Sequence, residues 1–322
     1  MIRRSLSLLQ KEALQGRAQM YQQIRAFFHQ KGVLEVETPI FSRAGNPDPS
    51  IQSLTADFQA FGSNQSLMRY AHTSPEFAMK RLLANDSGSI YQICKVFRLG
   101  ELGRLHNPEF SMLEWYRPGI SYIQLMDEIE ELLRILGIAE SCQRISFAML
   151  FKQYLELDIM TASVAELESC ANQHGLEIVG MIDEYNDWCN LLLSHLIEPK
   201  LKDLGVVFVY DYPESQAALA NIRTGNYPVA ERFELYINGI EIANGYQELT
   251  SESEYRQRFL SENEFRLKCG FDEVAIDEKL LDALKGGLPK SAGVAVGLDR
   301  LLMCILGYVN LNEVLSFDFS QA

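Results

Sequence analysis

The feature that most constrains the fold is the segment 231–249, where apolar and polar residues alternate on both sides of Asn238–Gly239. An Asn-Gly pair between two alternating runs is a strong signal for a two-residue hairpin turn, because both turn positions need positive φ. The other strand-like stretches do not alternate regularly with helices, as the strands of a parallel sheet would. We therefore expect an α+β fold with an antiparallel sheet flanked by helices.

Three acidic residues, Glu234, Glu241 and Glu248, recur along this hairpin at seven-residue intervals. An odd spacing on straight strands alternates between faces, so we expect the turn to fold Glu234 and Glu241 back toward each other. Two carboxylates near a triphosphate are natural Mg²⁺ ligands, because Mg²⁺ takes few protein oxygens and completes its octahedron with phosphate and water. A solvated strand face is the commoner alternative for an acidic hairpin.

The remaining patterns predict mainly helices. Apolar residues at helical spacing predict helices at 5–31, 121–137, 251–268, 276–285 and 299–306. Ser74 and Pro75 indicate a helix start, with Ser74 as N-cap and Pro75 at the first helical position. Residues 139–205 are helical in pattern and carry no chemical motif, so we interpret them as a helical insertion.

Composition narrows the classes of partner and site. The formal net charge of −14 disfavours nucleic acid as the main partner, and Lys80–Arg81 is a short basic pair of the kind that usually solvates a surface. None of the six cysteines falls in a CxxC pair, so neither a zinc site nor a redox motif is predicted. No apolar run reaches the roughly 18 residues of a membrane span, and we expect a cytoplasmic protein.

Two further segments could carry chemistry. Arg98 at a strand end, followed by a polar loop and His106, could grip a phosphate or carboxylate, or form one structural ion pair. Gly293–Gly297 could let a ligand approach a strand closely, with Asp299 as helix N-cap and Arg300 in the first turn. Tight packing of helix on sheet is the alternative for this second segment.

Together these segments resemble the signature motifs of class II aminoacyl-tRNA synthetases, and within that class the lysyl-tRNA synthetases. Val36–Pro39 resembles the dimer-forming first motif, Phe97–Phe110 the second and Gly297–Arg300 the third. The stretches closest to lysyl-tRNA synthetase are Ser74–Glu76, His106–Phe110, Glu114–Tyr116 and Glu234–Glu248. The resemblance covers almost the whole chain and is weakest at 139–205, so it implies one catalytic domain spanning 1–322.

Roughly 30 residues precede the first motif, too few for the five-stranded OB-fold that reads an anticodon. The chain is therefore similar to the stand-alone paralogues of lysyl-tRNA synthetase, which attach lysine, usually (R)-β-lysine, to a lysine side chain of elongation factor P. This resemblance implies a homodimeric ligase that uses ATP and Mg²⁺, forms an aminoacyl-adenylate and passes it to the acceptor amine. It also implies that tRNA is not a partner.

The resemblance assigns the nucleotide site. Arg98 would bind the α-phosphate and the amino-acid carboxylate, and Arg300 with His106 would hold the γ-phosphate. Asn107 would meet the adenine edge and Phe110 would stack on its ring. The other ATP contacts implied are Gly100, Glu101, Glu241, Ile242 and Gly297, and the Mg²⁺ ligands implied are Glu234 and Glu241.

The amino-acid pocket follows in the same way. Glu76 would take one ammonium, and Glu114, Tyr116 and Glu248 would take the other, with Asn244 close by. The remaining pocket residues implied are Ser74, Pro75 and Ala295. Independently of any family, a desolvated ammonium needs charged acceptors, and three acidic residues in one site suit a neutral amino acid poorly.

The chain departs from the family pattern at two places. Gly100 stands where the second motif usually has Glu, and Glu101 follows it; Ala295 stands where lysyl-tRNA synthetases usually have Gly. Two other functions stay open: a truncated synthetase-like enzyme with another acceptor, such as tRNA, and a non-catalytic synthetase-like regulatory subunit. The regulatory subunit is disfavoured because Arg98, His106 and Arg300 are all present.

Overall fold

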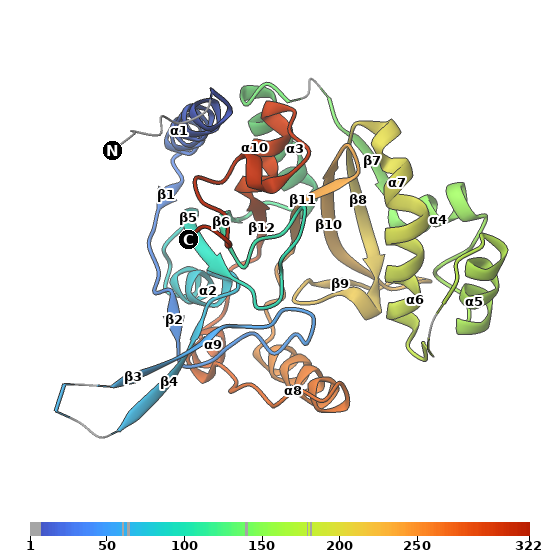
Figure 1. Cartoon of the computed structure of the whole chain (residues 1–322). Helices are drawn as coiled ribbons and strands as arrows, with labels where there is room; N and C mark the ends of the chain where they lie inside the picture. Colours follow the sequence, from blue (N-terminus) through green and yellow to red (C-terminus); the bar gives the residue numbers. More distant parts are fainter. Residues whose placement is uncertain (1–7, 60, 63–64, 139–140, 179, 181) are drawn as a thin grey trace.

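The computed structural model describes residues 8–59, 61–62, 65–138, 141–178, 180 and 182–322. Within that part of the chain a nine-stranded sheet forms the centre of the molecule (Figure 1). Its strands, in spatial order, are β1 (Leu34–Glu35), β5 (Ile90–Phe97), β6 (Glu109–Pro118), β12 (Ser291–Gly297), β11 (Ile240–Gln247), β10 (Val229–Ile237), β8 (Val206–Pro213) and β7 (Gln143–Ser146), with β9 (Ile222–Arg223) beside β10. Neighbours are antiparallel from β5 to β8, whereas β1 and β7 run parallel to theirs. The α+β architecture predicted from the sequence is confirmed.

One face of the sheet is covered by α1 (Leu8–Gln30), α3 (Tyr122–Ile135) and α10 (Leu298–Leu306) (Figure 1). Alternate strand residues such as Trp115, Phe233 and Val294 point into this layer and are buried there. The predicted start of α3 is confirmed, because Ser121 accepts from the backbone of Gln124 in a complete capping box. This layer is the main hydrophobic core.

The opposite face is covered only at its two ends. Over β8 and β10 lie α4 (Phe147–Leu155), α5 (Val164–Gln173), α6 (Tyr185–Leu192), a π-helical turn (Leu193–Ile197) and α7 (Glu198–Leu201). Over the β5 side lie α2 (Glu76–Ala84), α8 (Glu252–Lys268) and α9 (Glu278–Lys285). The middle strands β6, β12 and β11 therefore keep one face open between two helical clusters.

The smaller elements complete the chain. A separate sheet has the strand order β2 (Phe41–Ser42), β4 (Ser66–Ala71) and β3 (Thr55–Gln59). Short 3₁₀ turns occur at Lys202–Leu204, Glu214–Gln216 and Leu311–Glu313. No helix among the described residues is long and apolar enough to cross a membrane.

Two predictions of local structure need correction. The segment 139–205 is not helical throughout, because β7 pairs in parallel with β8 and extends the sheet. Helix α2 begins at Glu76 with Pro75 as its N-cap, one residue later than predicted; Ser74 Oγ still accepts from the backbone N–H of Glu76 at 3.0 Å. The hairpin turn is confirmed, with φ of 50° at Asn238 and 78° at Gly239.

Candidate active site

The open face of the middle strands carries one row of polar residues. In the strand register Glu114 on β6 is opposite Ala295 on β12, Ala295 is opposite Asn244 on β11, and Asn244 is opposite Glu234 on β10. Residues paired in this way project from the same face of a sheet. The first three line a cleft of about 1110 Å³, so the register alone brings together residues more than 180 positions apart in the chain.

Glu234 and Glu241 share this face because the hairpin contains a bulge. The register pairs Leu235 with Ala243 but Tyr236 with Glu241, which leaves Ile242 as an extra residue on β11. Glu241 therefore lies opposite Tyr236, which projects from the same face as Glu234. The prediction that the turn alone brings the two carboxylates together is wrong, because the bulge is also needed. The bulge also buries the Ile242 side chain in the main core, so only its backbone can face a nucleotide.

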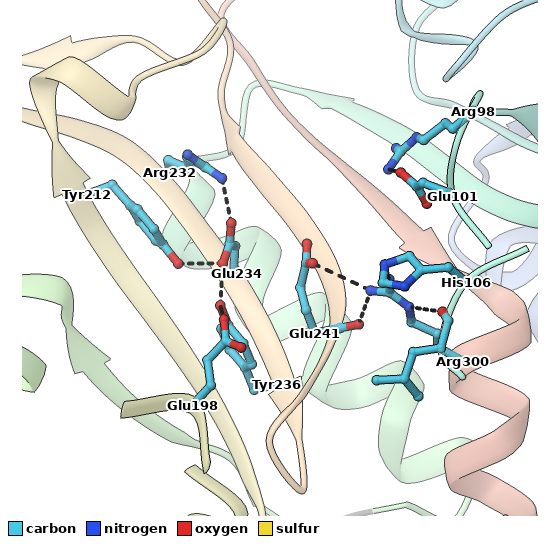
Figure 2. A network of polar contacts seen from close by, with 11 residues as sticks. Arg98, Glu101, His106, Glu198, Tyr212, Arg232, Glu234, Tyr236, Glu241 and Arg300 are labelled. Atoms are coloured by element: carbon cyan, nitrogen blue, oxygen red, sulfur yellow. Dashed lines mark hydrogen bonds and ion pairs between the residues drawn. The ribbon is translucent and has the colours of Figure 1, made fainter. Parts of the chain in front are cut away.

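Glu234 is held on both of its oxygens (Figure 2). Oε2 accepts from the hydroxyls of Tyr212 at 2.7 Å and Tyr236 at 2.6 Å, and Oε1 pairs with Arg232 at 2.5 Å. Arg232 also donates from Nε to Asn244 Oδ1 at 3.2 Å. Sequence analysis missed Arg232, although it stands two residues before Glu234 and therefore projects from the same strand face.

The pKa of Glu241 is raised because the partly exposed carboxyl is desolvated by its surroundings and close to Glu234, whereas Arg300 lowers it. Two close carboxylates of this kind favour a bound cation. The described residues contain no group of three or more His, Cys, Asp or Glu arranged to hold a metal ion. Such a sparse donor set fits Mg²⁺ shared with phosphates rather than a cage made entirely of protein.

Arg300 of the first turn of α10 is tightly placed (Figure 2). It donates to the backbone carbonyls of Glu241 at 2.9 Å and Leu105 at 3.1 Å, and its Nη2 lies 2.7 Å from Nε2 of His106. Burial and the Arg300 charge both lower the pKa of His106. The imidazole is therefore neutral at pH 7 and accepts at Nε2. Together the pair presents one positive charge with fixed geometry.

Arg98 lies near this pair, next to Glu101, and lines the cleft (Figure 2). Its Nη1 lies 3.5 Å from Glu101 Oε1, its Nε donates to the carbonyl of Thr73 at 3.4 Å, and its guanidinium lies 5.1 Å from the centre of the Phe110 ring. Gly100 has φ of 84°, a conformation that glycine adopts readily. The loop therefore turns at Gly100 and directs Glu101, rather than residue 100, toward Arg98.

Two other motif residues are engaged within the protein. The Asn107 side chain donates to the carbonyl of Glu109 at 2.6 Å and accepts from the backbone of Phe319 at 3.1 Å, and the residue is buried. The prediction that Asp299 is the N-cap of α10 is wrong, because Gly297 occupies that position. Asp299 instead accepts from the backbone of Ser111 and pairs with Arg17 of α1 at 2.5 Å, which anchors α10 to the sheet.

The amino-acid side of the cleft is strongly acidic. Glu114 accepts from Tyr116 at 2.6 Å and from Ser74 at 2.7 Å. Burial, and then the charge of Glu76, raise the pKa of Glu114 to about 7. Burial likewise raises the pKa of Glu248, while the neighbouring Lys80 lowers it. The same cleft is lined by Ser74, Glu76, Glu114, Tyr116 and Glu248. Their role in binding an amino acid stays a prediction.

Lys80 is the unexpected member of this pocket. Its side chain has no exposed surface, and Nζ lies 2.5 Å from Glu76 Oε1, 2.6 Å from Glu248 Oε2 and 2.8 Å from Tyr255 Oη. The prediction that Lys80 solvates the surface is wrong. The signal that could have found it is the Glu76–Lys80 spacing of four, which places both on one face of a helix.

Close packing at Gly293 completes the pocket. A Cβ at this position would lie 2.3 Å from Glu248 Oε1 and 2.4 Å from Tyr116 Cε1. Only glycine lets these two side chains meet over the strand. Gly293 also lies opposite Tyr116 and Tyr246 in the register, two residues before Ala295 on β12.

Comparison with known proteins decides the family. The class II tRNA synthetases of the D, K and N type match this chain over residues 4–321. The chain belongs to this family. Among curated members it is 44% identical over 307 residues to the elongation factor P–(R)-β-lysine ligase of Edwardsiella ictaluri, covering 95% of this chain and 94% of the relative. It is 43% identical to proteins of the same name from Mannheimia succiniciproducens (95% and 94%) and Pseudoalteromonas translucida (96% and 96%).

The segments resembling the second and third motifs lie on β5–β6 and on β12–α10, which are neighbours around the open face of the sheet. The third segment carries Arg300, and the second carries Arg98 and His106. The roles of the individual residues stay predictions.

Proposed function

We propose that this chain is an ATP-dependent ligase that activates (R)-β-lysine, or lysine, as an adenylate and transfers it to the ε-amine of a lysine on elongation factor P. The relatives named for this reaction cover nearly the whole chain. The observation that carries the proposal is the convergence of Glu76, Glu114 and Glu248 in one cleft with Arg98. Three carboxylates around a buried volume select a ligand with two ammonium groups.

In the first step the amino-acid carboxylate attacks the α-phosphorus of ATP in line, and pyrophosphate leaves. Arg98 faces both groups and neutralises the charge that develops between them. Arg300 and neutral His106 hold the terminal phosphate, and Phe110 supplies a flat face for the adenine. Tight positioning of this kind supplies most of the catalysis of a phosphoryl transfer.

Glu234 and Glu241 fit Mg²⁺, because their oxygens are hard ligands and because desolvation and the nearby Glu234 raise the pKa of Glu241. The ion neutralises phosphate charge when it is bound. Arg232, Tyr212 and Tyr236 hold the Glu234 carboxylate in one orientation for it. Divalent cation binding should therefore depend on Glu234 even in the absence of the amino acid.

In the second step the neutral acceptor amine attacks the acyl carbon of the adenylate. The C–N bond forms, the bond from the acyl carbon to the phosphate oxygen breaks, AMP leaves, and the amine loses one proton. No covalent enzyme intermediate is needed, since the adenylate is already activated. The cleft continues from the amino-acid pocket to residues of the α6 and α8 regions, which gives an acceptor a route to the adenylate.

The decisive experiment combines two assays. ATP–pyrophosphate exchange with (R)-β-lysine and with lysine tests activation, and mass spectrometry of elongation factor P from the same mixture tests transfer. Activation followed by transfer to tRNA instead would favour the alternative function, a truncated synthetase-like enzyme that charges tRNA. No amino-acid-dependent exchange at all would favour the regulatory subunit.

We also propose that the chain is a homodimer, as its resemblance to the first class II motif implies. The sheet β2–β4–β3 exposes Phe41, Phe58, Leu67 and Met68, an apolar surface that a second copy could cover. Light scattering after size-exclusion chromatography measures this directly. A monomer mass across the concentrations used for the exchange assay would contradict it.

A further inference from the structure

The buried Lys80 has a defined set of acceptors. Its three ammonium protons face Glu76 at 2.5 Å, Glu248 at 2.6 Å and Tyr255 at 2.8 Å, and its side chain has no exposed surface. An ammonium has three donors, so its hydrogen-bonding capacity is satisfied by the protein. The partners come from α2, from the residue that follows β11 and from α8, which are distant in the sequence.

The two carboxylates keep one oxygen each for another cation. Lys80 forms an ion pair with Oε2 of Glu248 at 2.6 Å, and neither buried oxygen of Glu248 has a further hydrogen-bond partner among the described residues. Glu76 receives Lys80 and the hydroxyl of Tyr246 on the same oxygen, Oε1. Both carboxylates line the cleft. Lys80 thus contacts one oxygen of each carboxylate, Oε1 of Glu76 and Oε2 of Glu248, and the other oxygen can accept from a ligand ammonium.

We propose that Lys80 is a specificity-determining, positioning residue that matches the charge of the pocket to a diamino acid. Ionised Glu76, Glu114 and Glu248 carry three negative charges, and Lys80 reduces them to two. Two is the number of ammonium groups on lysine or β-lysine. This inference rests on the proposed function for the identity of the ligand, but the geometry of Lys80 is independent of the acceptor.

The physical role follows from the cost of burying charge. A carboxylate in a dry site takes up a proton unless a cation is close. Burial raises the pKa of Glu248 and Lys80 opposes that rise. Without Lys80 the pKa of Glu248 would be higher still, so ionising this carboxylate to pair with a ligand ammonium would cost more free energy.

Other titratable groups face Lys80 and share this balance. They are Glu76 on α2, Tyr246 and Glu248 at β11, Tyr255 on α8, and Glu114 on β6 with Tyr116 beside it. The tyrosines stay neutral at pH 7, because burial raises their pKa values. The carboxylates are therefore the groups whose protonation responds when Lys80 is removed.

The test is Lys80→Met, a substitution that keeps most of the volume and removes the charge. Isothermal calorimetry with (R)-β-lysine and with lysine, without ATP, is run at several pH values and in two buffers of different ionisation enthalpy. We expect the dissociation constant at pH 7 to rise about tenfold or more, since one pKa unit corresponds to a factor of ten. We also expect the variant to release more protons on binding and to regain affinity as pH rises.

Tyr255→Phe is a milder variant, and it tests the inference even if Lys80→Met does not fold. It removes one acceptor of Lys80 without touching a carboxylate, so a smaller shift of the same pH profile is expected. Lys285→Met, which loses only the exposed ion pair with Asp282, is the matched control and should bind like the wild type. Unchanged affinity, proton release and pH profile in folded Lys80→Met or Tyr255→Phe would overturn the inference.

The proposed function can fail separately. If the wild type binds diamino acids with the expected pH profile but does not modify elongation factor P, the acceptor is wrong and the role of Lys80 stands. If neither diamino acid binds the wild type, the proposed class of substrate is wrong, and the role of Lys80 falls with it. A pH profile that shifts in Lys80→Met but not in Lys285→Met supports the inference directly.

Discussion

Arg232 joins the two halves of the candidate active site: its Nη2 pairs with Glu234 at 2.5 Å, and its Nε donates to Asn244 at 3.2 Å. Glu234 belongs to the proposed Mg²⁺ site and Asn244 to the amino-acid pocket. The planar guanidinium holds both acceptors in one fixed geometry, whereas a lysine ammonium is a point charge on a flexible stem. The two sites are therefore linked by one partly buried side chain on β10.

This link predicts that Arg232→Lys weakens both sites together. We expect the KM for the amino acid and the Mg²⁺ concentration for half-maximal exchange each to rise about tenfold, the effect of losing one charged hydrogen bond. ATP–pyrophosphate exchange titrated with each component measures this. A change confined to one of the two titrations would show that Arg232 does not couple them.

Arg98 is predicted to act mainly in the transition state. Arg98→Lys should lower kcat of pyrophosphate exchange by about 10² because a point charge replaces a planar fork at the developing charge. The matched control is Arg134→Lys, since Arg134 makes only an exposed pair with Glu130. If Arg98→Lys raised KM and left kcat unchanged, Arg98 would contribute ground-state binding alone.

Gly293 is predicted to admit no side chain. In Gly293→Ala the new Cβ would lie within 2.4 Å of both Glu248 and Tyr116, so these side chains must move out of the pocket. We expect affinity for the diamino acid to fall about a hundredfold, with the fold retained. Forcing an extra methyl group into a packed site typically costs about 1–3 kcal/mol. Gly225→Ala is the control, since its Cβ would have 3.7 Å to the nearest atom. Equal binding in the two variants would contradict the prediction.

Ala295 is predicted to tune the choice between lysine isomers. Its methyl lies on the sheet between Glu114 and Asn244, at the floor of the cleft. Ala295→Gly should improve use of α-lysine relative to β-lysine by about tenfold, the usual effect of one methyl group in a pocket. Ratios of kcat/KM for the two isomers test this, and identical ratios in both forms would rule the methyl out.

The raised pKa of Glu114 predicts that binding of the diamino acid depends on pH near neutrality. Burial and Glu76 raise its pKa to about 7, so below that pH the empty pocket holds a neutral acid that cannot pair with an ammonium. Affinity for the diamino acid should therefore rise as pH increases through about 7. Calorimetry across this range measures it, and Glu114→Gln, which cannot ionise, should bind weakly and lack the inflection.

Much of the fold could be predicted because it depends on neighbours in the sequence. The hairpin turn needs only Asn238–Gly239, and the start of α3 needs only Ser121 and Gln124. Strand β7 was missed because four residues inside a helical pattern give too short a signal. Parallel pairing with β8 stabilises it, and that pairing involves residues about 60 positions away.

The site shows the same division. The types of residue that carry its chemistry, such as Arg98, Arg300 and the glutamates, could be chosen from the sequence and its family resemblance. The bulge at Ile242 could not, because a register shift depends on how β10 packs against both of its neighbours. Without that bulge Glu241 would point away from Glu234.

The sequence by itself determined the α+β class, the hairpin and the motifs that mark the chain as a class II synthetase relative. Only the tertiary structure decided the charge balance of the pocket. Lys80 is a helix residue whose role depends on Glu248 and Tyr255, which come from elements about 170 residues later. The environment of a charge is set by what lies around it in space, and at Lys80 that environment is made by chain segments that meet only in the folded protein.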